Sequence, residues 1–348
     1  FKCTGEMVAE YSGASSYGLD LKKKQWMSVL SLTGLDMKKL PPLVKSTDQI
    51  GSGLTEQAAQ EMGLNPGTPV FGGCDDTQSA CIGSGMNSDG DIHIYLGTSA
   101  WVGAASRDKT QFKHGASAIQ SADINMNLIV GITEAAGSNI QWLIDQFFRQ
   151  EQKELGDGIY SYMDKVIETI PPGSDHLLCT PWMLGERCPV SSTTTRATLF
   201  NIGPEHTREH LMRAVYEGIG YNLRWILENF EKDYGFHCRQ FRIIGGGALD
   251  DAWMQIIADI TRAEFAVVDN PRNAGALGAA IIALIGLGEL ESFESAKQFV
   301  KENKTYRPNP ANGYIYDEMF ATYKRLYKSL KRTYYKANAL RFGGGEDD

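Results

Sequence analysis

The segment at residues 70–80 constrains this chain most, because it joins an apolar strand, a glycine turn, two adjacent carboxylates and the start of a small-residue helix. Asp75 and Asp76 follow the glycine turn directly. A second apolar strand at residues 92–96 ends in the loop Gly97-Thr98-Ser99, whose exposed backbone N–H groups can hold phosphate. A carboxylate and a phosphate-binding loop so close in the chain indicate phosphoryl transfer.

A third loop, Gly245-Gly246-Gly247-Ala248, follows a predicted strand at 241–244 and precedes a predicted helix at 251–262. Each glycine turn alone is explained by a tight chain reversal. Together, the loops after strands 92–96 and 241–244 give two places where backbone N–H groups can meet anionic or polar ligand atoms. The chain contains neither GxxxxGK[ST] nor GxGxxG with an acidic residue about 20 positions later, which excludes the Walker A loop and the ordinary dinucleotide motif.

Apolar periodicity and turn residues predict that helices and strands alternate, which is typical of α/β architecture. One predicted helix, at residues 56–62, is capped by Thr55 and ended by Gly63. The same signals predict further helices at 138–149, 158–170 and 204–230 and strands at 69–71, 128–133 and 177–180.

Two interpretations of Asp75 and Asp76 stay open at this point. An aspartate after glycine commonly caps the following helix, and one of the two can have that role. A carboxylate at a strand end near a phosphate loop can also accept the proton of an attacking hydroxyl, while phosphoryl transfer otherwise needs mainly positioning and charge neutralisation.

The run from His206 to His210 matches the HxxEH pattern, in which two imidazoles four residues apart can share a zinc ion. A metallohydrolase is therefore an alternative, and bound zinc would be its signature. The run lies at the start of the long predicted helix, where the helix dipole accounts for Glu205 and Glu209, and the sequence marks no third ligand. We therefore favour a structural role.

Composition excludes several classes of protein. A formal net charge of −8 argues against nucleic acid as a partner. The apolar run at 274–288 is shorter than the roughly 20 residues that span a bilayer, which predicts a buried helix and no membrane association. Six scattered cysteines without a CxxC pair indicate reduced thiols, and hence a cytoplasmic protein.

In their order and spacing these motifs resemble the FGGY family of carbohydrate kinases, most closely its xylulokinase-like members. The resemblance covers nearly the whole chain. Residues 72–76 resemble the family's glycine turn with its catalytic aspartate, 95–99 its second phosphate motif, 243–248 its adenosine motif and 274–279 the segment called connect 2. Residues 185–189, together with Arg196 to Gly218, follow its C-terminal signature region.

The resemblance implies an actin-like ATPase fold with two ribonuclease H-like domains and a cleft between them. Residues 1–90 would be the C-terminal part of domain I, residues 91–342 would be domain II, and residues 343–348 a disordered tail. The family's first phosphate motif has no counterpart in the chain. We therefore expect that an N-terminal portion of domain I is absent and that the chain alone is not a competent kinase.

The resemblance also implies a site. Asp75 would be the general base, while Gly97, Thr98 and Ser99 would hold the phosphates of ATP. The adenosine would lie on Gly245, Gly246, Gly247 and Ala248. Mg²⁺ would neutralise charge between the phosphates, and closure of the domains would exclude water. The acceptor would be a small-molecule sugar, with D-xylulose as the first guess among ketopentoses and polyols, and a homodimer is one candidate assembly.

Two positions depart from the family pattern. Asp76 stands where xylulokinases usually carry asparagine, so it is a candidate substrate-binding residue, and its charge should raise the proton affinity of the neighbouring base. Asn201 stands where the signature normally has glycine. An alternative of another class is a catalytically silent actin-like module that binds nucleotide or regulates a partner, which would need the glycine loops but not Asp75.

Overall fold

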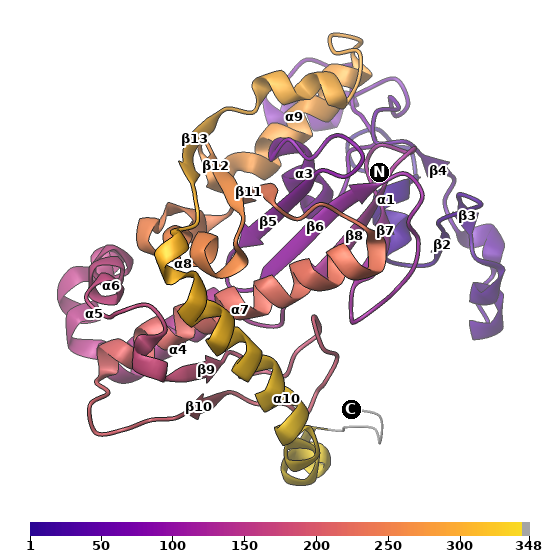
Figure 1. The fold of residues 1–348 in the computed structure, drawn as a ribbon. Coiled ribbons are helices and arrows are strands. Elements are labelled where there is room, and N and C mark those ends of the chain that lie inside the picture. Colours follow the sequence, from indigo (N-terminus) through magenta and orange to yellow (C-terminus); the bar gives the residue numbers. More distant parts are fainter. Residues whose placement is uncertain (343–348) are drawn as a thin grey trace.

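The computed structural model describes residues 1–342, so the predicted disordered tail at 343–348 lies outside the described residues. The largest sheet has seven strands in the order β13-β12-β11-β5-β6-β8-β7 (Figure 1). Their bounds are β5 (Ile92–Leu96), β6 (Ala100–Ser106), β7 (Ser117–Gln120), β8 (Asn127–Ile132), β11 (Gln240–Ile244), β12 (Glu264–Val268) and β13 (Glu302–Tyr306).

The parallel centre of this sheet sets the position of the glycine loops. β11 pairs in parallel with both β5 and β12, whereas all the other neighbours are antiparallel. Ile94 of β5 is in register with Ile243 of β11. Because parallel strands end at the same edge of a sheet, the loops that follow β5 and β11 emerge side by side.

Alternation along β5 divides its side chains between two cores. Ile92, Ile94 and Leu96 join a core with α4 (Gly137–Phe147), α6 (Ile159–Glu168), α7 (Arg208–Tyr234) and α8 (Asp251–Thr261). Tyr95 faces the other way and packs with residues of α3 (Asp76–Gly83) and α9 (Ala274–Gly286). The sheet is therefore covered by helices on both faces, and the predicted α/β class is confirmed.

Helices α3 and α9 approach each other through their backbones. A Cβ atom added at Gly83 would lie 1.8 Å from the carbonyl oxygen of Ala274, and one added at Gly278 would lie 1.9 Å from that of Ser79. Because no side chain fits at either position, glycine is required where the two helices cross.

The first 75 residues consist of short elements. β1 (Ala9–Glu10) pairs in parallel with β4 (Leu43–Val44), and β2 (Leu19–Asp20) pairs antiparallel with β3 (Gln25–Trp26). Two short helices accompany them, α1 (Tyr11–Ser15) and α2 (Glu56–Met62). The prediction for α2 is confirmed, since Thr55 accepts the Ala58 N–H and Gly63 ends the helix with a left-handed conformation.

The predicted strand at 69–71 is wrong, because only Phe71 forms a β-bridge, with Gln49. Proline at position 69 has no N–H to donate, and the N–H groups of the two glycines that follow go to carbonyl oxygens of Asp48 and Ser46. The segment is therefore held as a loop.

The strand predicted at 177–180 is confirmed as β9 (Leu178–Thr180), which pairs with β10 (Thr198–Phe200) in a separate two-stranded sheet. Two helix predictions need correction. The helix predicted at 138–149 ends at Phe147, and α5 (Arg149–Leu155) starts after a break at Phe148. The long helix begins at Arg208 rather than 204.

The C-terminal helix α10 (Gly313–Phe342) packs the aromatic side chains of Tyr316, Phe320 and Tyr323 into the larger core. Eight short 3₁₀ segments connect the elements, at Ser28–Thr33, Met37–Lys39, Gly156–Gly158, Ser174–His176, Gly246–Leu249, Pro271–Asn273, Glu294–Phe299 and Pro310–Asn312. Within residues 1–342 there is no helix that is both long enough and apolar enough to span a membrane.

Candidate functional site

Asp75 is the N-cap of α3. Its Oδ1 accepts the N–H of Gln78 at 2.8 Å, so the capping interpretation is correct for this residue. The turn before it depends on glycine, since a Cβ at Gly72 would lie 2.3 Å from the carbonyl oxygen of Lys45. A cap engages one carboxylate oxygen and fixes the side chain, which leaves the second oxygen as an acceptor. Capping and proton acceptance are therefore compatible roles.

The environment of Asp75 favours its protonated form. Burial is the main cause that raises the pKa of its carboxyl, and the charge of Asp76 raises it further, whereas the Gln78 N–H lowers it. Asp76 is exposed, and its Oδ1 accepts the N–H of Thr77 at 2.8 Å. The charge of Asp76 thus raises the pKa of Asp75, as expected from the sequence.

Glu10 is a carboxylate near Asp75 that the sequence did not single out. It caps α1 by accepting the N–H groups of Ser12 at 2.8 Å and Gly13 at 3.1 Å on Oε2. Its other oxygen, Oε1, is buried and has no hydrogen-bond partner among the described residues. Burial chiefly raises the pKa of Glu10, and the charge of Asp75 contributes. Little in the sequence indicated this capping role, because glutamate is an uncommon N-cap residue.

A cavity of about 790 Å³ opens where β5 and β11 end. Gly97, Thr98, Gly246 and Gly247 line it, so both glycine loops contribute to one pocket. The rest of the wall comes from α4, α6, α7, α8, the 3₁₀ segment Gly156–Gly158, the two residues before α8 and the segment that precedes α9. Ser99, Gly245 and Ala248 are not lining residues, and neither Asp75 nor Asp76 contributes to this cavity.

Close backbone packing shapes both loops. Gly245 has φ +97°, and a Cβ there would lie 2.3 Å from the carbonyl oxygen of Leu96. The carbonyl oxygen of Thr98 accepts the N–H of Ser138 at 3.0 Å, and the oxygen of Gly97 accepts that of Gly137 at 3.0 Å. The β5 loop is therefore fixed against the first turn of α4, and the β11 loop against the end of β5.

The charged residues of the wall are mostly acidic, with one arginine among them. Arg272 lies next to Gly246, is exposed, and has no carboxylate partner within the described residues. The other charged lining residues are all acidic: Asp145, Asp157, Asp164 and Asp250. An anionic group therefore fits best beside Arg272, next to Gly246.

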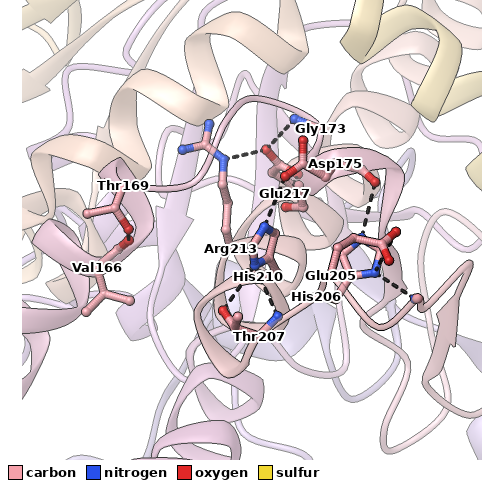
Figure 2. Close-up of polar contacts among 12 residues, drawn as sticks. Val166, Thr169, Gly173, Asp175, Glu205, His206, Thr207, His210, Arg213 and Glu217 are labelled. Carbon is pink, nitrogen blue, oxygen red and sulfur yellow. Dashed lines mark hydrogen bonds and ion pairs between the residues drawn. The ribbon is translucent and has the colours of Figure 1, made fainter.

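The two imidazoles of the HxxEH pattern have structural partners (Figure 2). His206 Nδ1 accepts the Gly203 N–H at 2.7 Å, and its Nε2 lies 3.2 Å from the carbonyl oxygen of Asp175. His210 Nδ1 accepts the Thr207 N–H, and its Nε2 lies 3.1 Å from Asp175 Oδ2. The described residues contain no group of three or more potential metal ligands, so the geometry supports the structural role.

Glu186, in the segment that resembles the signature region, holds neighbouring segments together through hydrogen bonds. Glu186 is buried and accepts the N–H groups of Glu134 at 2.7 Å and Arg187 at 2.9 Å, together with Asn222 Nδ2 at 2.6 Å. Asn201 has φ +68°, a conformation that glycine adopts freely and asparagine tolerates better than most residues. This explains why asparagine can replace the glycine of the family pattern.

The fold is that of the actin-like ATPases, of the ribonuclease H-like type. The profile described as "FGGY family of carbohydrate kinases, C-terminal domain" matches residues 92–287, and the one described as its N-terminal domain matches residues 1–83. The chain therefore belongs to the FGGY family of carbohydrate kinases.

The similar proteins include xylulose kinases and gluconokinases. The xylulose kinase of Bacillus subtilis strain 168 is 32% identical over 335 residues, which cover 95% of this chain and 65% of that protein. The gluconokinase of Bacillus licheniformis is 27% identical over 338 residues, which cover 96% and 66%. The chain thus spans about two thirds of the length of these two relatives.

Solved structures show the same fold. The xylulose kinase from Rhodospirillum rubrum superposes with a TM-score of 0.84 at 25% identity and covers 96% of this chain and 66% of its own. The gluconate kinase from Lactobacillus acidophilus gives a TM-score of 0.86 at 23% identity and covers 97% and 67%.

Proposed function

We propose that the protein transfers the γ-phosphate of ATP to a hydroxyl group of a neutral ketopentose or related polyol, with D-xylulose as the first candidate. The observation that carries this proposal is the convergence of two glycine loops on one cavity in a chain of the FGGY family. Their exposed backbone N–H groups can bind phosphate oxygens, and the cavity is large enough for a nucleotide.

In this proposal Gly97, Thr98, Gly246 and Gly247 contact the nucleotide directly, because they line the cavity. Ser99, Gly245 and Ala248 act by shaping the loops, since they lie beside it. Arg272 places a positive charge at the phosphate end. Six free cysteines agree with a cytoplasmic location, which we also propose.

A bound Mg²⁺ ion would neutralise the charge that develops on the transferred phosphoryl group. Within residues 1–342 there is no ready-made cluster of three protein ligands. This fits Mg²⁺, which usually keeps several waters and is held by one or two carboxylates plus substrate phosphates.

Asp75 is proposed as the general base. The cap at α3 fixes its carboxyl, and burial raises its pKa, which makes the ionised form a better proton acceptor. It would take the proton of the sugar hydroxyl as that oxygen attacks phosphorus. Residues 1–90 and 91–342 would belong to the two domains of the fold, and their closure would exclude water from the reaction.

The acceptor is proposed to be neutral because of the charge around Asp75. Glu10, Asp75 and Asp76 are three carboxylates in one region, and within the described residues none of them forms an ion pair. A substrate that carries its own carboxylate, such as gluconate, would be repelled there. This favours D-xylulose over gluconate, although relatives of both names exist.

A coupled assay of ADP release by the full-length protein tests the proposal with D-xylulose, other pentuloses, glycerol and gluconate as acceptors. Neutral ketopentoses should give the highest kcat/KM. A preference for gluconate would refute the charge argument, and ADP release that no acceptor stimulates would favour the alternative of a silent actin-like nucleotide-binding or regulatory module.

A further inference from the structure

Arg187 lies beside the β5 loop, which comprises residues 97–99. Its Nη2 donates to the carbonyl oxygen of Thr133 at 3.2 Å. The N–H of Thr133 donates to the carbonyl oxygen of Ala100 at 2.8 Å, and its Oγ1 accepts the Ala100 N–H at 3.0 Å. Because Ala100 directly follows Ser99, Thr133 connects the guanidinium group to the end of the loop.

The two ends of the β5 loop have different neighbours. Gly97 and Thr98 line the cavity, whereas Thr133 and Arg187 are not lining residues. Asp75 does not line the cavity either, so a phosphoryl group that leaves ATP for an acceptor beside Asp75 has to pass out of it. The γ-phosphate is the part of ATP farthest from the nucleoside, and it is therefore the part that can reach Arg187.

Two carboxylates fix the position of Arg187. Its Nε forms an ion pair with Glu134 Oε2 at 2.6 Å. Glu186 is only 4% exposed, and its Oε1 accepts the backbone N–H groups of both Glu134 and Arg187. One buried oxygen thus holds both members of the ion pair. An ion pair on the surface contributes little to stability, so stability alone does not account for this anchoring.

The Arg187 side chain is accessible to a ligand. It is 52% exposed. A guanidinium group carries five N–H donors, so the contacts with Glu134 and Thr133 leave others for a ligand. The planar fork of these donors matches two oxygens of a phosphoryl group, which makes arginine better suited to this contact than lysine.

We propose that Arg187 is a catalytic residue that binds the phosphoryl group during its transfer, and that Glu134 is a positioning residue for the guanidinium group. The inference rests on the proposed function and adds a residue to it. The acceptor oxygen forms a bond to the γ-phosphorus while the bond from that phosphorus to the bridging oxygen breaks. ADP leaves with the electron pair, and Asp75 takes the proton of the hydroxyl group. Arg187 stabilises the negative charge on the oxygens of the group in transfer.

The test compares Arg187→Ala with wild type in the full-length protein, using the acceptor that gives the highest kcat/KM. The kcat should fall by about 10²–10³-fold, as expected for loss of a donor that stabilises developing charge. Calorimetry should show about tenfold weaker binding of a nonhydrolysable ATP analogue, because a charged hydrogen bond to the γ-phosphate is lost. ADP lacks that phosphate, so its affinity should change little. The matched control is Arg107→Ala, which removes an exposed arginine after β6, at the opposite end of the sheet, and should change none of these quantities.

Chemical rescue separates a catalytic from a structural role. Added guanidinium ions should restore part of the kcat of Arg187→Ala, because they can occupy the space of the lost group. Glu134→Gln should lower kcat less and show no rescue, since Arg187 is still present. Arg187→Lys keeps the charge beside Glu134 and serves as a second variant if Arg187→Ala does not fold. It should still weaken the ATP analogue more than ADP.

A wild-type kcat in Arg187→Ala would overturn the inference and leave the proposed function standing. Equal losses of affinity for ADP and the ATP analogue, or a loss of kcat that guanidinium ions do not restore, would show a structural role and also overturn it. ADP release by the wild type that no acceptor stimulates would instead overturn the proposed function. Circular dichroism of each variant confirms that it is folded.

Discussion

The carboxylate region at the start of α3 and the cavity at the ends of β5 and β11 are built in different ways. The first is local: Asp75 caps α3 by accepting the N–H of Gln78, and Asp76 accepts the N–H of Thr77. The second joins elements that are far apart in the sequence, from Gly97 to Arg272. A local site depends on one side chain, whereas an assembled cavity depends on backbone fit. Substitutions in the first region should therefore affect catalysis, and substitutions in the second should affect stability and nucleotide binding.

The largest expected effect is that of Asp75→Asn. Asparagine can still cap α3, but it cannot accept a proton, so kcat should fall by about 10²–10⁴-fold. Nucleotide affinity should change little, because Asp75 does not line the cavity. Steady-state kinetics together with calorimetry of ADP binding separate the two quantities. Phosphorylation at the wild-type rate would show that Asp75 is not the base.

Backbone fit of the cavity is tested by Gly245→Ala. The added Cβ would lie 2.3 Å from the carbonyl oxygen of Leu96 at a positive φ, so the free energy of unfolding should fall by about 1–3 kcal/mol and ADP affinity should fall with it. Gly275→Ala is the control, since a Cβ there meets nothing within 4 Å and alanine favours the helix. Urea denaturation of both variants measures the difference, and equal stabilities would contradict the packing argument.

The smallest effect should come from Asp76→Asn. The charge of Asp76 raises the pKa of Asp75, so its removal should lower that pKa. A base works only when it is deprotonated, and its activity is lost as pH falls through its pKa. The acidic limb of kcat/KM should therefore move to lower pH in the variant. Asp108→Asn, which removes an exposed carboxylate elsewhere, should leave the limb in place. A shift to higher pH in Asp76→Asn would contradict the stated coupling.

Local signals made part of the structure predictable. Thr55 and Gly63 marked both ends of α2. The glycine loops at 97–99 and 245–248 were placed correctly after their strands, because turn chemistry acts over neighbouring residues. The strand at 69–71 failed for the opposite reason, since pairing depends on a distant partner and Pro69 removes a donor.

The acidic lining of the cavity was not predicted. Asp164 lies on α6 and Asp250 at the start of α8, and only the tertiary fold brings both to consecutive N–H groups of one turn. Tyr216 of α7 was not singled out from the sequence. Glu10 was missed in the same way, because its proximity to Asp75 depends on the parallel pairing of β1 with β4.

The glycine crossing of α3 and α9 has a mechanical consequence. α3 begins immediately after Asp75, and α9 begins two residues after Arg272. The two crossing helices therefore connect the proposed base to the arginine of the cavity. Direct backbone contact leaves no side chain that could yield between the two helices. The distance between Asp75 and Arg272 therefore depends on this backbone contact, and a methyl group added at Gly83 or Gly278 should change that distance while touching neither residue.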